Sequence, residues 1–208
     1  MGPSSSALKS NLNVITDMKK IIPALSLILF LGVYTTQSMA DQRQAAPPVE
    51  MAAAAPVIES AFSPEAGGEN LVLKVIYASK KELRLAAYSF TSPTVVKALL
   101  AARQRGVDVR VIVDYKRNLG KSSLSALRQL TDAGIAVKTN AFYALHHDKY
   151  IVVDGQHVQS GSYNYTAGAA DSNSENVLVV WNDPVLAAAY VKHWDSRWEQ
   201  GVIFPVQN

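Results

Sequence analysis

The strongest constraint on the fold is the alternation of strand-period and helix-period segments that begins at Val57. Apolar residues three and four positions apart indicate helices, whereas short β-branched runs bounded by turn residues indicate strands. Helices are predicted over residues 70–79, 93–105, 122–133 and 184–200, and strands over 83–90, 107–114, 135–139, 150–154, 158–162 and 176–181. This order predicts an α/β fold, an αβα sandwich with a central mixed β-sheet and one domain per chain.

The first 40 residues have the pattern of a secretory signal peptide behind a short polar extension. Met18–Lys20 gives a positive start, residues 21–33 form an apolar run, and Ser38–Ala40 provides small residues for cleavage. The run has 13 residues, fewer than the roughly 20 that span a bilayer. We expect cleavage near Ala40, export to the periplasm or medium, and no stable membrane insertion of the mature chain. An uncleaved signal anchor is the alternative.

Residues 41–56 are rich in alanine and proline and are predicted to form a linker, so the folded domain is expected over 57–208. The chain has no cysteine. The exported domain must therefore be held together by its core, and a lipoprotein anchor is excluded.

Charge is concentrated in the middle of the chain. Residues 41–208 carry 17 Lys and Arg against 16 Asp and Glu, a net charge of +1. Residues 74–138 alone carry 13 basic and 4 acidic side chains, whereas residues 139–208 have a net charge of −4. This asymmetry favours one cationic face and a polyanionic substrate. A helix surface made basic for solubility is the alternative.

The stretch LHHDKYIVVDGQHVQSGSYNYT holds the residues that indicate chemistry. His147 and Lys149 are two positions apart on a predicted strand and so share one face. Ser162 and Asn164 have the same spacing at the end of the next predicted strand. If the strands are neighbours, an imidazole, an ammonium, a hydroxyl and an amide converge, which describes a phosphate pocket that contains a nucleophile. Glu175, just before the following strand, could reach the imidazole.

The spacing of these residues resembles the HKD motif of the phospholipase D superfamily. The matching positions are His147, Lys149, Asp154, Gly161, Ser162 and Asn164, and Glu175 follows His147 by 28 residues. The likeness covers residues 57–208, which makes this segment a phospholipase D-like catalytic domain. It is greatest to the small, exported, single-motif bacterial endonucleases of that superfamily.

The resemblance implies a role for each residue. His147 would attack phosphorus and form a phosphohistidine, while Lys149 and Asn164 would bind the phosphoryl oxygens. Ser162 would contact the phosphate or orient the nucleophile, and Glu175 would pair with His147. No metal and no cofactor is implied.

Asp154 completes the motif and is counted with the candidate catalytic residues. Its strand parity is opposite to that of His147 and Lys149, which predicts a supporting or turn role at Asp154-Gly155. His146 fits no position of the motif.

A single motif per chain implies a homodimer. The family mechanism needs two histidines, one as the nucleophile and one as the general acid. A two-fold axis between two copies would supply one His147 from each subunit to a shared active site.

Three basic residues, Lys116, Arg117 and Lys121, follow the strand predicted over 107–114. Ligands of α/β sheets bind at the carboxyl ends of strands, so this loop is a candidate contact for a nucleic-acid backbone. A solvated turn is the alternative.

The sequence leaves three functions in competition. The first is an exported, metal-independent, non-specific endonuclease that cleaves DNA or RNA. The second is a lipid phosphodiesterase of the phospholipase D type, against which stands the lack of a long apolar loop or amphipathic helix in the mature chain. The third is a binding protein without activity, which the intact His-Lys-Asn-Glu set argues against.

Overall fold

The computed structural model describes residues 55–205. The predicted leader (1–40) and nearly all of the predicted linker (41–56) lie outside this part. The elements are β1 (Val57–Ser63), α1 (Gly68–Ala78), β2 (Glu82–Ala87), α2 (Pro93–Gln104), β3 (Asp108–Asp114), the 3₁₀ turn η1 (Lys116–Asn118), α3 (Lys121–Asp132), β4 (Ala136–Asn140), β5 (Lys149–Val153), β6 (His157–Gly161), α4 (Ala167–Asp171), β7 (Glu175–Trp181), α5 (Pro184–Gln200) and β8 (Val202–Ile203). Within this part of the chain, no helix has the length and apolar character needed to cross a membrane.

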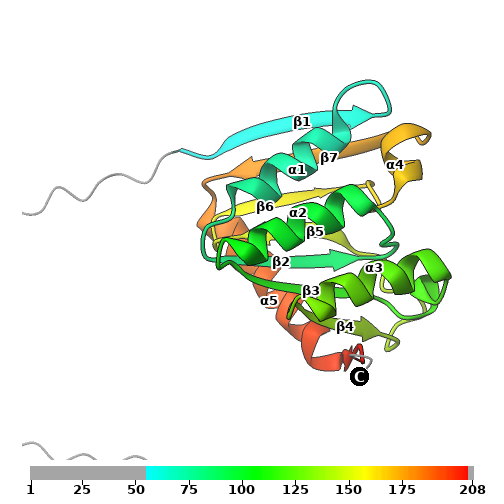
Figure 1. Ribbon diagram of the computed structural model, residues 1–208. Coiled ribbons are helices and arrows are strands. Elements are labelled where there is room, and N and C mark those ends of the chain that lie inside the picture. Colours follow the sequence, from blue (N-terminus) through cyan, green and yellow to red (C-terminus); the bar gives the residue numbers. More distant parts are fainter. Residues whose placement is uncertain (1–54, 206–208) are drawn as a thin grey trace, which may run out of the picture. The chain divides into compact units, whose positions relative to one another are not determined.

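One eight-stranded sheet organises the domain, in the order β1-β7-β6-β5-β2-β3-β4-β8 (Figure 1). Strands β2, β3 and β4 are parallel neighbours, joined by α2 and α3. The remaining neighbours are antiparallel, including the central pair of β2 and β5. The expected mixed sheet is therefore confirmed.

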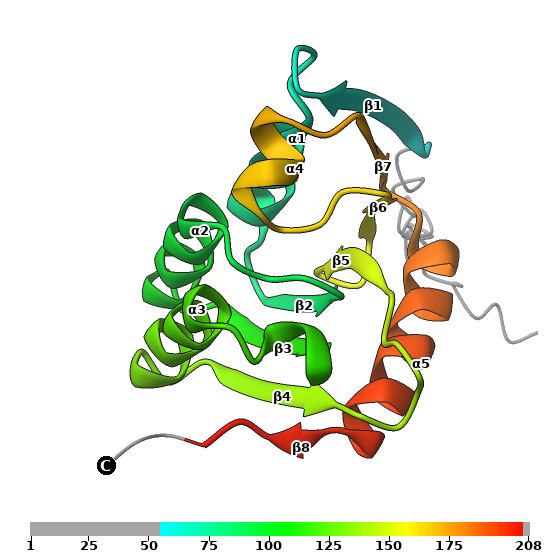
Figure 2. The same ribbon diagram turned by 90° about the vertical axis from the view of Figure 1, so that its right-hand side faces the viewer.

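Helices cover both faces of the sheet (Figure 2). Apolar side chains of α1, α2 and α3 pack with one face in a core that includes Leu85 and Val111. Helix α5 packs on the other face, where Trp194 is fully buried and its indole donates a hydrogen bond of 3.1 Å to the carbonyl of Leu85. The predicted αβα sandwich is confirmed.

Local sequence signals predicted most helix and strand boundaries to within a few residues. Ser92 caps α2 by accepting a hydrogen bond from the amide of Val95, and Pro93 is the first helical residue. Asp183 caps α5 in the same way through the amide of Leu186. Strand β1, the short elements α4 and β8 and the turn η1 were not predicted.

The candidate residues lie at one edge of the sheet, where strands begin or end, and Figure 2 looks onto it. The parallel strands β2, β3 and β4 end here, and β5 begins here, since Ala87 pairs with Lys149. Strand β6 ends here and β7 begins here, since Gly161 pairs with Val177. This edge is called the catalytic edge below, because it carries the candidate residues.

Candidate active site

The central pair of the site lies where the chain enters β5. His147 is exposed and precedes the strand, whereas Lys149 is its first residue and is 8% exposed. The expectation that both lie on the strand was therefore wrong for His147. The pair is nevertheless in contact: the Lys149 Nζ lies 3.3 Å from each ring nitrogen of His147 and donates to its carbonyl at 2.9 Å. Burial lowers the pKa of Lys149, and the charges of Glu175 and Asp148 oppose that shift.

Tyr88 supports this pair from the end of β2. Its ring centroid is 4.4 Å from that of His147. The Lys149 ammonium lies 5.2 Å from the ring, and the guanidinium of Arg117 lies 5.8 Å from it. The sequence did not reveal Tyr88, because an aromatic residue at the end of an apolar strand is usually core. Its position at the carboxyl end of a predicted strand was the only available signal.

The turn after β6 brings Ser162 against Glu175. The Ser162 hydroxyl donates to the Glu175 carboxylate and accepts from the amide of Asn176 at 3.1 Å. The same carboxylate accepts from the side chain of Asn173 at 3.0 Å. Gly161 permits the turn, because its φ is 142° and a Cβ there would collide with the carbonyl of Asn176.

Glu175 was expected to pair with His147. In the described part of the chain, the hydrogen bonds of its carboxylate go to Ser162 and Asn173. Its charge acts on Lys149, for which it favours the protonated form. Glu175 is therefore placed to hold the serine and to support the ammonium.

Asn164 lies between two anchors. Tyr163 and Tyr165 are fully buried on either side of it, and the Tyr165 hydroxyl donates to Gln159 at 2.9 Å. The Oδ1 of Asn164 is buried and has no hydrogen-bond partner within residues 55–205. The buried tyrosines thus fix the backbone of a loop whose amide side chain is left unpaired.

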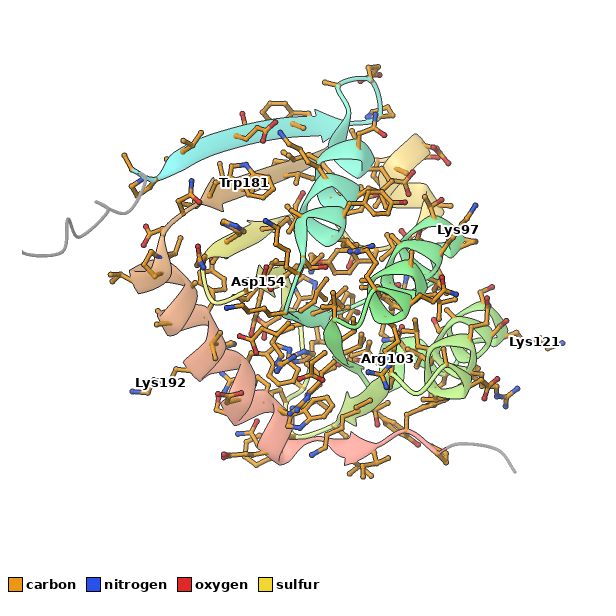
Figure 3. The ribbon with its side chains drawn as sticks, turned by 60° about the vertical axis from the view of Figure 1, so that its left-hand side comes forward. Lys97, Arg103, Lys121, Asp154, Trp181 and Lys192 are labelled. Carbon is orange, nitrogen blue, oxygen red and sulfur yellow. The ribbon has the colours of Figure 1, made fainter. Side chains whose placement is uncertain are left out.

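Asp154 does not join the site, which corrects its inclusion among the catalytic residues. It follows the last residue of β5, at the opposite edge of the sheet, which Figure 3 brings forward. Its φ is 54°, and its carboxylate accepts hydrogen bonds from the amides of Lys80, Lys81 and Glu82 at 2.7–3.0 Å. Its role is to tie the β5 turn to the start of β2.

His146 is a buried neighbour of the site. Its side chain is almost fully enclosed, and its amide donates to Asp114 at 2.8 Å. Burial lowers the pKa of His146, and the charges of Asp148 and Asp114 oppose the shift. Asp148 also contacts His193 of α5 at 3.0 Å. His146 therefore helps to hold the loop between β4 and β5 in place.

The three basic residues lie around the end of β3. Lys116 and Arg117 form the exposed turn η1, and Arg117 reaches the site through Tyr88. Lys121 begins α3 and points into solvent away from the sheet (Figure 3). Of the three basic residues, the structure thus brings Arg117 near His147 and Lys149.

Exposed apolar side chains also lie on this edge, in the loops that follow β3 and β4. They are Tyr115, Leu119, Phe142 and Leu145, with exposed fractions of 45%, 53%, 69% and 52%. These four residues are called the apolar rim below. Within residues 55–205, no group of three or more histidine, cysteine, aspartate or glutamate side chains is arranged to hold a metal ion.

The family described as "Cardiolipin synthase, PLD-like domain" matches residues 72–198, which include all of these site residues. The chain belongs to the phospholipase D superfamily. The match to this family makes the protein a phosphodiester hydrolase, and an exposed imidazole, a cation and an unpaired amide lie at one edge of its sheet.

Two solved structures align with the domain. Nuc from Salmonella typhimurium, a phospholipase D family member, is 41% identical with a TM-score of 0.71, and the alignment covers 72% of this chain and 99% of Nuc. NucT from Helicobacter pylori covers 72% of this chain and 100% of its own, with a TM-score of 0.61. Its identity is 20%, so it supports the fold alone.

Two proteins of similar sequence have lipid-related names. The phospholipase D of Rickettsia prowazekii is 33% identical over 140 residues, which cover 67% of each chain. The mitochondrial cardiolipin hydrolase of Xenopus laevis is 36% identical over 145 residues, which cover 70% of this chain and 64% of its own.

Proposed function

We propose that the protein is an exported, metal-independent endonuclease that cleaves DNA, and also RNA, through a phosphohistidine on His147. The observation that carries this proposal is the contact chain from Arg117 through Tyr88 to His147. This chain links a cation of the exposed turn η1 to His147, and it supports the proposal that Arg117 binds the next phosphate of a polynucleotide. The 41% identity to Nuc and the resemblance to small exported endonucleases point the same way.

The side chains suit a two-step displacement. A ring nitrogen of His147 forms a bond to phosphorus as the bond from phosphorus to the departing oxygen breaks. Lys149 and Asn164 bind the non-bridging oxygens and stabilise the charge that builds on them. Water then attacks the phosphohistidine, which releases the phosphate end and restores His147. In this proposal the positive charge that faces the phosphate comes from Lys149.

The departing oxygen needs a proton, and the proposed source is His147 of a second copy, which then takes a proton from the attacking water in the second step. A two-fold axis at the catalytic edge would set two imidazoles on opposite sides of one phosphate. The apolar rim supports this arrangement, because exposed apolar side chains next to a site favour a protein interface. The proposed enzyme is therefore a homodimer with a shared site.

The location of the enzyme is proposed from its first 40 residues. Their charged start, apolar run and small-residue end support export and cleavage near Ala40. Release of a protein that begins at Asp41 into the periplasm or medium, read by mass spectrometry, is the expected result.

A lipid phosphodiester is the second candidate substrate. The names of the Rickettsia and Xenopus relatives favour it, and so does the apolar rim, which could rest on a lipid surface. One assay separates the candidates: purified protein is given plasmid DNA, RNA and phospholipid vesicles in parallel, with EDTA throughout. We expect nucleic acid to be cleaved and vesicles to stay intact. Cleavage of vesicles alone, or activity only after a divalent ion is added, contradicts the proposal.

Subunit mixing tests the shared site. Wild-type chains are mixed with His147→Asn chains, so that mixed dimers hold one imidazole at the site. Activity should fall faster than the wild-type fraction. A monomer by ultracentrifugation that cleaves DNA at the full rate would exclude the homodimer.

A further inference from the structure

A pocket of about 470 Å³ opens beside His147 and Lys149, on the face of the sheet that α5 covers. His147 and Lys149 stand at its margin, whereas Ser162, Asn164 and Glu175 are not among the described residues that line it. Its walls come from the start of β5, the end of β6 and the middle of α5. The volume lies within the range of roughly 300–1,000 Å³ that is typical of small-ligand sites.

One of the residues that line the pocket has a buried hydroxyl without a partner. Tyr150 lines the pocket and is 4% exposed, and its hydroxyl has no hydrogen-bond partner among residues 55–205. Burial, followed by the charge of Asp148, raises the pKa of Tyr150, so the phenol keeps its proton and can donate. An unpaired hydroxyl in a buried place is costly. A ligand acceptor in this pocket would remove that cost.

The other walls offer an aromatic face and further polar atoms. The Tyr190 ring of α5 lies 5.0 Å from that of Tyr150 at 79°, which leaves it edge-on to its neighbour and in the wall of the pocket. His193 is held by Asp148 at 3.0 Å, and Ser160 is the register partner of Tyr150 in the sheet. The pocket therefore combines one aromatic ring with several hydrogen-bonding side chains.

This combination fits a nucleoside better than a hydrocarbon chain. An acyl chain has no acceptor for Tyr150 and would leave its buried hydroxyl unpaired. A base can stack on a tyrosine and accept a hydrogen bond through its ring or carbonyl atoms. We propose, as a refinement that rests on the proposed nuclease function, that this pocket binds the nucleoside next to the scissile phosphate. Since a paired base cannot leave its stack freely, the occupant is an unpaired nucleotide.

Small substrates test the pocket apart from the rest of a nucleic acid. Thymidine 5′-(p-nitrophenyl phosphate), its 3′ isomer and methyl p-nitrophenyl phosphate share a leaving group but differ in whether they carry a nucleoside. The full-length enzyme should show a higher kcat/KM for at least one thymidine ester than for the methyl ester. We define the nucleoside preference as the ratio of these two values.

Two variants should reduce that preference. Tyr150→Phe removes only the unpaired hydroxyl, so the preference should fall about three- to tenfold while Tm stays equal or rises. Tyr190→Leu removes the aromatic face and should lower the preference about tenfold, whereas Tyr190→Phe should keep most of it. The matched control is Tyr77→Phe, an exposed tyrosine of α1 on the other face of the sheet, which should leave the preference unchanged.

Failure of this inference is distinct from failure of the proposed function. If plasmid DNA is cleaved but neither thymidine ester is preferred, or Tyr150→Phe leaves the preference intact, the pocket does not bind the nucleoside. A similar drop in Tyr77→Phe also overturns the assignment. If DNA and all three esters resist cleavage while phospholipid vesicles are hydrolysed, the nuclease function itself is wrong.

Discussion

The two ends of β5 carry parts of the same sequence motif, but their polar side chains differ in whether the protein itself supplies their partners. At the far end, three backbone amides satisfy the Asp154 carboxylate. At the catalytic edge, Lys149 is 8% exposed, and no carboxylate of residues 55–205 lies within ion-pair distance of it. Nearby, Asn164 has an unpaired oxygen. At the far end the polar side chain is satisfied by the protein's own backbone, whereas at the catalytic edge polar groups remain free to bind a substrate.

Removal of the nucleophile should break this comparison most sharply. His147→Asn should lower kcat at least a thousandfold, because it removes the imidazole proposed to attack phosphorus. The exposed side chain supports little packing, so Tm should change by no more than about 2 °C. Plasmid cleavage and thermal unfolding measure the two effects.

His146→Ala is the matched control for the nucleophile. It should retain activity in the folded protein but lower Tm, because His146 is buried. Equal losses of activity in the two variants would show that His147 is not the nucleophile.

Substitution of Asp154, at the far end of β5, should lower stability without changing activity. Asp154→Ala leaves three amides without their acceptor and places alanine at a φ of 54°. The free energy of unfolding should fall by about 2 kcal/mol or more, since hydrogen bonds to charged groups contribute roughly 1.5–3 kcal/mol. Urea unfolding measures this loss. Asp154→Asn, which tolerates the same φ and keeps one acceptor oxygen, should lose less. Specific activity of the folded fraction should be unchanged. A large fall in that activity would show that Asp154 does contribute to catalysis.

The basic residues sharpen the comparison by separating binding from catalysis. Replacing Lys116, Arg117 and Lys121 together by alanine should reduce the salt dependence of DNA binding by about 2 to 3 units of the log–log slope. KM should rise about tenfold at moderate salt, with little change in kcat. Arg117→Ala alone should account for more of the rise than Lys121→Ala, because only Arg117 reaches Tyr88. An unchanged slope would move the nucleic-acid contact elsewhere.

The smallest effect is expected from the charge of Glu175. Burial lowers the pKa of Lys149 and the Glu175 carboxylate opposes that shift. Glu175→Gln removes the opposing charge, so Lys149 should lose its proton at a lower pH than in the wild type. The alkaline limb of the kcat profile should therefore move to lower pH. Asn173→Ala keeps the carboxylate and should leave that limb in place. A limb that does not move in Glu175→Gln means that Lys149 does not set it.

Local signals predicted the elements well where the determinants are near in sequence. The cap at Ser92 with Pro93 fixed the start of α2, and the apolar runs located the strands of the core. Strand β1 was missed as a strand because it is an edge strand with mostly exposed side chains. Its pairing with β7 is a contact between distant segments, which periodicity does not report.

The sequence named candidate site residues but only part of their geometry. His147, Lys149, Ser162 and Asn164, chosen by their spacing, lie at or just beyond the ends of β5 and β6 on the catalytic edge. The spacing did not show that β5 begins at Lys149 or that Glu175 bonds to Ser162, because both depend on where loops leave the sheet. The place of Tyr88 depends on the register of β2 with β5, which no local pattern contains.

The pairing of β1 with β7 has a consequence for biosynthesis. β1 is the first element of the domain and β7 the only strand it pairs with in the described chain, so its hydrogen bonds wait until residues 175–181 have been made. Glu175 of the site lies in that same strand. During synthesis, the ribosome would therefore hold a chain whose β1 strand is unpaired and whose catalytic edge is incomplete. Closure of the sheet and completion of the active centre then coincide, and a chain cut short before β7 gains neither.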